Sequence, residues 1–468
     1  MTLILLFASQ ILNSIHNIHN WNRLQKTFVL AAGLPLYHGK DSGPALNTLY
    51  GPVSVIAYLP ATFFPTPASA MRAACFLALT FYLLPVGWIF WGRKFSHAVD
   101  RRWAWLLFFG FCFLTLMMYS LKNAAFNVHV DAPTLGLGMV SCAFLYFRKK
   151  PDCWISLFLS AATAVLAVES KLVAAPLVAA LPIYILLTDG RKIFFRYCGF
   201  LLFHGIFWTL LFGSVFGAQN LFFNTVVIPA HHPFKENGGI QALFLFCDKL
   251  IREYLLILPV FFIAVWHREK WRRAPGILLL VVAALMLPAA YLGFVKIGGS
   301  RNALSYTNYF LLTGLMMAWL GSVCQENAAM PARPFGLKKI TVLLMLFLTA
   351  AQAAYAVSGI LRPAGKINQA NVAYEYAKAH PQETYFPTLT PIHWFAEGQF
   401  YHDVNAVMDR NIAGYPLTEE RLAAFFPARL RLIAFPEGND YMGWLHPPQF
   451  GPAGRDSALP GFIVYQKQ

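Results

Sequence analysis

Hydrophobic residues gather in long apolar stretches along most of the chain, and this pattern predicts a protein built largely from membrane-spanning helices. A helix that crosses a bilayer needs roughly 20 mainly apolar residues. The expected fold class over residues 1–359 is therefore an all-α polytopic membrane protein. We expect about eleven spans, near 1–17, 70–92, 103–121, 133–147, 153–168, 172–188, 197–217, 253–266, 275–295, 308–324 and 340–359.

Three longer polar segments interrupt or follow these spans, at 18–69, 218–252 and 360–468. In the first, the apolar spacing from Leu24 to Leu34 predicts a helix that lies along the membrane surface. The last segment, of about 105 residues, suffices for one small α/β domain. Its expected elements are a helix over 368–379, a strand over Tyr385–Leu389, a helix over Leu417–Phe426, and strands over Leu430–Phe435 and Phe462–Tyr465.

Basic residues indicate which loops face the cytoplasm. They cluster in five short loops, at 93–102, 148–150, 191–196, 268–273 and 333–339, while the short loops between these carry one or two each. By the positive-inside rule the five basic loops are cytoplasmic. This places the N-terminus inside and residues 360–468 in an extracytoplasmic position. The net charge of +16 then reflects orientation, and no nucleic-acid partner is expected.

Composition narrows the class of protein further. Only 12% of the residues are charged and 57% are hydrophobic, whereas a soluble domain carries about 25% charged residues. A soluble enzyme and a disordered scaffold are both excluded. The seven Cys form no C-x-x-C pair, so neither a disulfide framework nor a zinc site is indicated. No Asp, Glu, Lys or Arg lies near the middle of a predicted span, which disfavours an ion-coupled transporter.

Asp131 is the acidic residue whose surroundings most strongly suggest chemistry. It lies at the outer start of the fourth predicted span, two residues before Pro133. An Asp there can cap the free N–H groups of the first helical turn, a role that needs no ligand. The alternative is a carboxylate at the membrane surface that binds a metal ion or a sugar hydroxyl, or accepts a proton. His129 either shares that work, as a metal ligand or a polar contact, or is simply an interfacial histidine.

Two outer turns carry cations of the kind that bind a phosphate. Lys171 follows Glu169 and Ser170 between two apolar runs, where it either holds the turn by an ion pair or meets a phosphate at headgroup level. The segment 296–302 has two glycines and two cations, the second of them Arg301. Glycine lets backbone N–H groups approach an anion, although a plain turn with snorkelling cations has the same sequence.

Two histidine pairs are weaker candidates for a metal site. His16 and His19 are three residues apart at the start of the first outer segment, and His231 and His232 are adjacent in the third. A structural zinc site needs about four ligands, so two histidines alone are a nonspecific pattern. For both pairs we therefore favour residues of an interfacial loop over a metal site.

Several short motifs stand in a recognisable order. They are Gly33–Tyr37 followed by Tyr50-Gly51-Pro52 and Tyr58-Leu59-Pro60, then His129-Val130-Asp131-Ala132, Ser170-Lys171 and Asn308-Tyr309-Phe310-Leu311. This order resembles the GT-C superfamily of integral-membrane glycosyltransferases, which includes bacterial mannosyl- and arabinosyltransferases. The first group is similar to a G-x-P-x-Y, Y-G-P and Y-x-P run after the family's first helix. The others resemble its acidic motif in the second outer loop, its lysine before a later span and its N-Y pair in a late span.

The resemblance implies an enzyme of the bacterial inner membrane that moves a sugar from a polyprenyl-phosphate donor, with inversion, to a glycan, lipid or protein acceptor. A carboxylate takes the acceptor's proton and cations stabilise the leaving phosphate. Some family members use a divalent ion, magnesium or manganese, at the acidic motif, so Asp131 and His129 are the metal candidates. The expected roles are Asp131 and Asp41 as base or acceptor anchor, Lys171, Arg301 and Arg23 on the phosphate, and His129, His19, Asn22 and Tyr309 on acceptor or sugar.

One departure from the family concerns the acid that normally follows the first helix. This chain has His19-Asn20-Trp21-Asn22 there, and Asp41 is the only acid in residues 1–99. Either Asp41 supplies the carboxylate, or Asp131 does, or the protein is inactive or differently catalysed. Other classes therefore stay open: a polymerase, ligase or flippase of lipid-linked glycans, which would depend on outer arginines, and a nonenzymatic membrane assembly protein.

Overall fold

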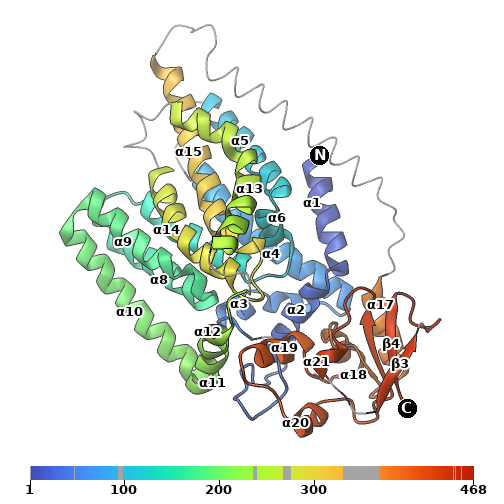
Figure 1. Cartoon of the computed structure of the whole chain (residues 1–468). Helices are drawn as coiled ribbons and strands as arrows, with labels where there is room; N and C mark the ends of the chain where they lie inside the picture. The colour runs from blue at the N-terminus through green and yellow to red at the C-terminus, as the bar shows by residue number, and fades with distance from the viewer. Residues whose placement is uncertain are drawn as a thin grey trace.

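The computed structural model describes residues 2–46, 48–92, 98–235, 240–266, 276–329, 368–445, 447, 449–454 and 456–468. Helices form the first part of the chain, and a small sheet with short helices forms the last part (Figure 1). The expected span at 340–359 lies outside the described residues.

The long helices follow the predicted apolar stretches. They are α1 (Thr2–Asn13), α4 (Pro67–Trp91), α5 (Ala98–Met117), α7 (Asp131–Tyr146), α8 (Trp154–Ser170), α9 (Ala175–Asp189), α10 (Arg191–Phe216), α13 (Ile240–Trp266), α14 (Gly276–Val295) and α15 (Ser305–Ala329). Shorter elements connect them: η1 (Ser14–His16), α2 (Ile18–Ala31), α3 (Val53–Ile56), η2 (Leu59–Phe63), α6 (Tyr119–Phe126), η3 (Leu172–Ala174), α11 (Ala218–Phe222), η4 (Phe223–Val227), α12 (Ile228–His231) and η6 (Arg301–Leu304).

Four helices of the described part are long and apolar enough to cross a membrane: α4, η3 with α9, α10 and α14. The helices α5 and α6 meet this test together but are bent by 98° at their junction, so they make a fifth span only if the bent pair is counted as one. The stretches Leu3–His16 and Trp154–Ser170 are apolar but shorter. These helices support an integral membrane protein, and the count of about eleven spans stays a prediction.

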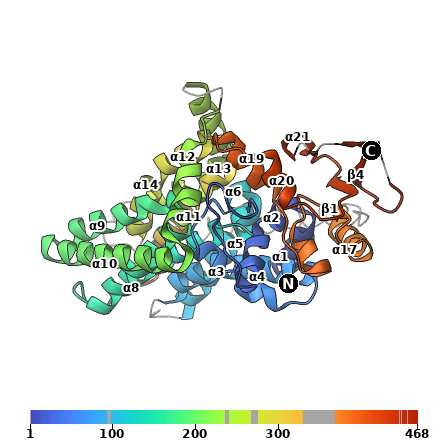
Figure 2. The same cartoon turned by 90° about the horizontal axis from the view of Figure 1, so that it is seen from below.

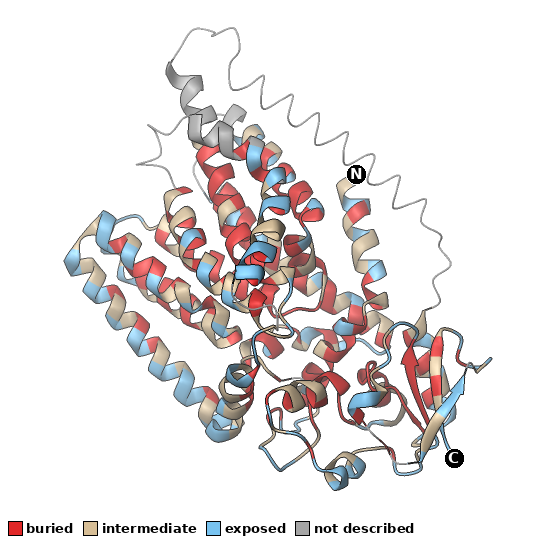
Figure 3. Ribbon diagram, in the orientation of Figure 1, coloured by how far each residue is buried: buried red, intermediate tan, exposed pale blue. Residues whose placement is uncertain are grey.

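Burial distinguishes the two sides of the helical part. Buried residues fill its interior, whereas exposed ones run along the outer face of α10 (Figure 3). That outer face carries large apolar side chains, namely Phe195, Leu202, Phe203, Ile206, Phe207, Leu210, Leu211 and Val215. A contiguous apolar surface of this size is unfavourable in water. It suits a helix whose outer face contacts lipid tails.

The helices α4 and α7 pack so closely that a side chain is excluded at one point between them. A Cβ atom on Gly136 of α7 would lie 2.3 Å from the carbonyl oxygen of Phe81 in α4. On the lipid-facing helix α10, by contrast, Gly199 has no atom within 4 Å of its Cβ position. Close packing therefore requires glycine at position 136, whereas no neighbouring atom requires it at position 199.

We expect Gly136→Ala to destabilise the protein by about 1–3 kcal/mol, because overpacking a close helix contact forces the backbones apart. Gly199→Ala is the matched control, and it should leave stability equal or slightly higher because Ala favours a helix by up to about 1 kcal/mol. Thermal unfolding in one detergent measures both variants. Equal melting temperatures would contradict the close packing of α4 on α7.

The C-terminal part contains one four-stranded sheet with short helices around it. Its elements are α17 (Gln369–Ala379), β1 (Thr384–Tyr385), α18 (Pro391–Glu397), α19 (Val404–Ile412), α20 (Glu419–Ala424), β2 (Leu432–Pro436), α21 (Met442–Leu445), β3 (Phe450–Gly454) and β4 (Phe462–Lys467). The strand order is β1-β2-β4-β3; β1 runs parallel to β2, and the other pairs are antiparallel.

The predicted helices at 368–379 and 417–426 and the strands at 430–435 and 462–465 correspond to α17, α20, β2 and β4. The strand predicted over Tyr385–Leu389 is wrong beyond Tyr385. Pro387 has no N–H to donate to a strand partner, and the N–H of Leu389 instead donates to the carbonyl of Phe386 in a turn. The sequence did not predict α18, α19, α21 or β3.

The C-terminal part is joined to the helical part by a shared apolar core. Trp21 and Phe28 of α2 belong to the same buried cluster as Phe386 and Ile392, and the rings of Phe28 and Phe395 meet edge to face with centroids 4.9 Å apart. Beyond this core, α19 lies next to α12 in both views of the molecule (Figures 1 and 2). This docking brings one face of α19 to the ends of the helices, where the candidate site lies.

Candidate active site

A cavity of about 710 Å³ opens where α2, the segments before α7 and η6, α12 and α19 meet. It is lined by three cations and, among the described residues, by one carboxylate. The cations are Arg23, Lys171 and Lys296, and the carboxylate belongs to Asp409. Asparagine and histidine side chains supply most of the other polar groups: Asn17, Asn22, Asn123, Asn302, Asn405, His19, His129 and His232. The cavity thus suits an anionic ligand that also carries hydroxyl groups.

Helix α2 supplies one wall of the cavity. Its N-terminus is capped by Asn17, whose side chain accepts a hydrogen bond from the N–H of His19. His19, Asn22 and Arg23 are spaced three and four residues apart and so share one face of the helix, and all three line the cavity. Asn20 points elsewhere, and its amide donates to Asn127 and accepts from the N–H of Val128. This ties α2 to the segment that carries His129.

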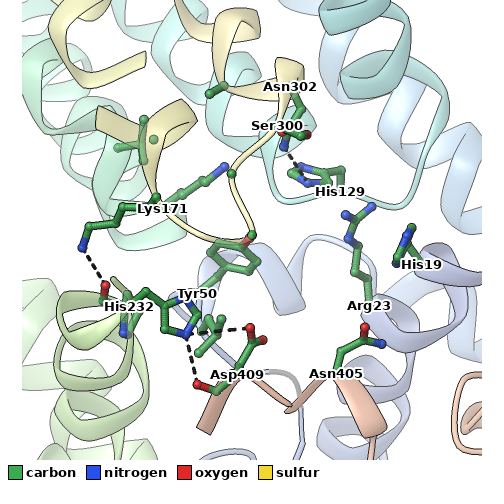
Figure 4. A pocket seen from close by; sticks show the side chains of 18 of the residues that line it. His19, Arg23, Tyr50, His129, Lys171, His232, Ser300, Asn302, Asn405 and Asp409 are labelled. Atoms are coloured by element: carbon green, nitrogen blue, oxygen red, sulfur yellow. Dashed lines mark hydrogen bonds and ion pairs between the residues drawn. The ribbon is translucent and has the colours of Figure 1, made fainter. Parts of the chain in front are cut away.

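Two side chains on this wall form no hydrogen bond with a described residue. The amide nitrogen and oxygen of Asn22 are buried and neither forms a hydrogen bond. Arg23 forms no hydrogen bond or ion pair with any described residue, and its side chain extends toward His129 (Figure 4). Burial lowers the pKa of Arg23 below its ordinary value, yet a guanidinium stays charged at neutral pH. An unpartnered amide and an unpartnered cation are costly in isolation and indicate a ligand.

Asp131 is fully buried directly behind the cavity wall and holds several lining residues in place. Its Oδ1 atom accepts from Lys171 Nζ at 2.8 Å and from the Tyr306 hydroxyl at 2.7 Å. Its Oδ2 atom lies 2.8 Å from His129 Nδ1 and 3.4 Å from the Asn302 amide. Both oxygens are therefore already occupied, and Asp131 itself is not among the lining residues.

The contact with Asp131 determines which nitrogen of His129 carries the proton. Nδ1 lies 2.8 Å from Oδ2 of the carboxylate and 3.2 Å from the backbone nitrogen of Asp131. Two acceptors at the shorter distance would repel, so we assign Nδ1 as the donor to the carboxylate. Nε2 can then accept from the Asn302 amide at 3.2 Å. Burial more than any other effect lowers the pKa of His129 to about 4, which leaves the ring neutral near pH 7. Its two nitrogens are thus both used inside the protein.

The residues present do not fit a divalent metal at Asp131. The nearest cation to its carboxylate is the Lys171 ammonium, and both oxygens already have partners. Over the whole described part of the chain, no group of three or more His, Cys, Asp or Glu side chains is arranged to hold a metal ion. We therefore derive no step through a metal.

The glycine-containing turn at 296–302 forms the wall opposite α19. Its backbone is anchored to the preceding loop, since the N–H of Ile297 donates to Pro233 and the N–H of Lys235 to Val295. Gly298 has a φ of 82°, which a residue with a side chain rarely adopts. Lys296 donates to the carbonyl of Pro229 at 2.8 Å. This bond holds the third cation at the cavity edge.

The C-terminal part supplies the last wall. Asn405 and Asp409 are four residues apart on α19 and so point the same way, and with Met408 and Tyr441 they line the cavity. Asp403 caps the start of α19 by accepting from the N–H of Asn405 at 2.8 Å. Figure 4 shows Asp409 beside His232 and Asn405 below Arg23. The cavity is therefore shared between the helical part and the C-terminal part.

The structure brings together most of the residues that the sequence singled out. Arg23, Lys171, His129, His19 and Asn22 all line the cavity, and Asp131 lies behind it. Lys171 pairs with Asp131 rather than with Glu169, whose carboxylate accepts from Thr209 instead.

Three predicted site residues lie elsewhere. The Arg301 guanidinium packs over the Tyr119 ring, 5.6 Å from its centroid. Tyr309 is fully buried among the helices, where its hydroxyl donates to the carbonyl of Tyr82. Asp41 is exposed beside Arg421 in a separate hollow, because the guanidinium of Arg421 donates to the backbone carbonyls of residues 40, 42 and 43.

Sequence reasoning missed five side chains that complete the site: Tyr306, Asn302, His232, Asn405 and Asp409. For two of them the sequence pattern led us to select a nearby residue instead. Asn302 directly follows Arg301, and Tyr306 lies three residues before Tyr309. His232 was noted only as half of a histidine pair. Asp409 had no local signal, since its position depends on how the C-terminal part docks.

Comparison with known proteins bears on the fold. The structure is similar to that of ArnT from Cupriavidus metallidurans bound to undecaprenyl phosphate, with a TM-score of 0.58 and 14% identity over 100% of this chain and 97% of that chain. The apo state of ArnT gives a TM-score of 0.56 with 14% identity, over 99% and 98%. The oligosaccharyltransferase AglB from Archaeoglobus fulgidus gives 0.46 with 12% identity, over 93% and 69%, too low a score to support an argument. No family model matches the chain, and no curated protein matches it in sequence.

The chain therefore shares its overall fold with ArnT. This agrees with the polytopic membrane fold that the sequence motifs led us to expect. At 14% identity the similarity concerns the fold alone, so activity has to be argued from the residues of the cavity.

Proposed function

We propose that this protein is a membrane glycosyltransferase that moves a sugar from a polyprenyl-phosphate donor to the hydroxyl of an extracytoplasmic glycan, lipid or protein. One observation carries the proposal above the others: Arg23 points into a cavity with two further cations and forms no ion pair or hydrogen bond with a described residue. In a GT-C glycosyltransferase, the anion expected to bind there is the phosphate of the lipid-linked donor. The solved neighbour ArnT was bound to undecaprenyl phosphate, which supports the choice of lipid.

The chemistry follows from where charge develops. As the acceptor oxygen bonds to the anomeric carbon with inversion, the bond from that carbon to the phosphate oxygen breaks and negative charge grows on the phosphate. Arg23, Lys171 and Lys296 are placed to stabilise this charge without rearranging. The amides of Asn22 and Asn405 can bond sugar hydroxyls, which are both donors and acceptors. The C-terminal part covers one side of the cavity and would take part in choosing the acceptor.

Turnover of labelled donors tests the proposal. Purified protein in detergent is offered a panel of undecaprenyl-phosphate hexoses and pentoses, with water or cell-envelope extract as acceptor. A glycosyltransferase breaks the sugar–phosphate bond and releases undecaprenyl phosphate. A flippase leaves every donor chemically unchanged in detergent and moves it only across sealed liposomes. Intact donors throughout the panel, combined with lipid movement in liposomes, would overturn the proposal in favour of a flippase.

A further inference from the structure

Transfer to a hydroxyl releases a proton, and the cavity must hold a group that can take it. The base has to lie within hydrogen-bond reach of the acceptor and must not already be used by the protein. Asp131 does not meet this condition, since its two oxygens accept from Lys171, Tyr306, His129 and Asn302.

The histidines of the cavity are poor bases for different reasons. Both nitrogens of His129 have partners. Nε2 of His232 lies 3.1 Å from the backbone carbonyl of Asp409 and donates to it, and burial lowers the pKa of this ring, which makes its other nitrogen a weak base. Partial desolvation and then the charge of Arg23 lower the pKa of His19 to about 4, so its ring binds a proton only weakly near pH 7.

Asp409 is different from each of these groups. Among the described residues that line the cavity, Asp409 is the one carboxylate, and no described residue donates a hydrogen bond to its oxygens. His232 Nε2 lies 3.8 Å from Oδ1, beyond hydrogen-bond distance, and its proton is directed at the backbone carbonyl instead. The Asp409 carboxylate therefore lies in the cavity with its lone pairs available.

We propose that Asp409, from the C-terminal part of the chain, is the catalytic base that accepts the proton of the acceptor hydroxyl. This inference rests on the proposed function. In the transfer step the acceptor O–H bond breaks and its proton passes to an Asp409 oxygen, while the acceptor oxygen bonds to the anomeric carbon. The bond from that carbon to the phosphate oxygen breaks with its electron pair on the phosphate. Before the step, Asp409 and the donor phosphate each carry one negative charge. After it, Asp409 is neutral and undecaprenyl phosphate carries both charges.

The surroundings of Asp409 adapt it to this work near neutral pH. Burial and then the charge of Asp403 raise the pKa of Asp409 to about 7, and a base works best when its pKa lies near the working pH. Asp403 at the start of the same helix acts on Asp409 by its charge, and His232 Nε2 lies 3.8 Å from Asp409 Oδ1. Tyr441 and Lys296 line the same cavity. Burial lowers the pKa of His232, so that ring stays neutral. Asp403 is the charge that acts most directly on Asp409.

The protonation state of Asp409 determines the direction of the pH dependence. Below about pH 7 Asp409 is protonated and cannot accept a proton, and above it the carboxylate is free. We expect kcat/KM for wild-type donor turnover to rise through an apparent pKa near 7, and we expect this rise to be absent in Asp409→Asn.

The experiment compares Asp409→Asn, Asp409→Glu and the control Asp41→Asn, whose carboxylate lies in a separate hollow. The probe is a labelled undecaprenyl-phosphate sugar that the wild type consumes, and undecaprenyl phosphate binding is measured in parallel. We expect Asp409→Asn to lower kcat about 10²–10⁴-fold with undecaprenyl phosphate binding retained. Asp409→Glu should keep part of the activity with a shifted pH profile, and Asp41→Asn should resemble the wild type.

The outcomes separate this inference from the proposed function. A wild type that consumes no donor contradicts the function itself. A wild type that turns donor over while Asp409→Asn keeps both its rate and its pH profile overturns the role of Asp409 alone. Should Asp409→Asn fail to fold, Asp409→Glu decides: an unchanged pH profile overturns the inference and a shifted one supports it.

Discussion

Asp131→Asn is expected to destabilise the protein by about 3–5 kcal/mol, because breaking a buried ion pair leaves the other charge without a partner. Lys171 would lose its counter-ion while its ammonium stays largely buried beside the rings of Tyr50 and Tyr306. Chemical unfolding in a single detergent, followed by tryptophan fluorescence, measures the change.

A double variant tests whether the lost ion pair is the cause. Replacing both partners, as Asp131→Asn with Lys171→Met, removes the stranded charge, and such replacements are often close to neutral. We expect the double variant to recover much of the stability lost in Asp131→Asn. A double variant that is less stable than Asp131→Asn would show that the carboxylate acts through Tyr306 and His129 rather than through Lys171.

Arg23→Gln is expected to have the opposite signature: a large loss of activity with little loss of stability. Removing one group that stabilises developing charge lowers kcat about 10²–10³-fold, and Arg23 forms no hydrogen bond or ion pair with the described residues. Burial already lowers the pKa of Arg23, so replacing it by a neutral side chain should keep the protein as stable as the wild type or make it more stable. Donor turnover and melting temperature, measured on one preparation, check both parts.

Arg301→Gln is the matched control for this change. The same substitution is made in an arginine near the cavity, but its guanidinium packs on Tyr119 and does not line the cavity. We expect donor turnover to change little. If Arg301→Gln abolished turnover and Arg23→Gln did not, the phosphate would bind on the other side of Tyr119.

The sequence was most informative where one local property decides the structure. Apolar length located the helices from α1 to α15 within a few residues in most cases, because a spanning helix must satisfy its own backbone. The exception is α13, which begins at Ile240 rather than near 253. Its first turns carry Asp248, Lys249 and Arg252, so hydrophobicity alone did not reveal them as helix.

The cations of the site were also predictable in part. Lys171 follows a long apolar helix at a turn, and Arg23 lies one helical turn from His19 on the short helix α2. Both positions are predicted to lie at a membrane surface, where a buried cation needs an anion. The sequence could not separate these from Arg301, because an arginine on an aromatic ring and an arginine in a cavity have the same local pattern.

The roles of the acids could not be predicted, for a physical reason. Whether a carboxylate serves as a base depends on how many donors it already accepts from, and those donors come from distant segments. Asp131 is occupied by groups 40 and 175 residues away in the sequence. Asp409 reaches the cavity only because Phe386 and Ile392 share a core with Trp21. The sequence around Asp131 and around Asp409 therefore indicates neither of these contacts.

The central claim is that the cavity holds the phosphate of a polyprenyl lipid against Arg23. The most direct test is a cryo-electron-microscopy structure of the wild-type protein in lipid nanodiscs with undecaprenyl phosphate added. We predict phosphate density within hydrogen-bond distance of Arg23, in the cavity between α2 and α19, with Lys171 or Lys296 as a second contact. Undecaprenyl phosphate bound with its phosphate outside this cavity, or an empty cavity at saturating lipid, would contradict the claim.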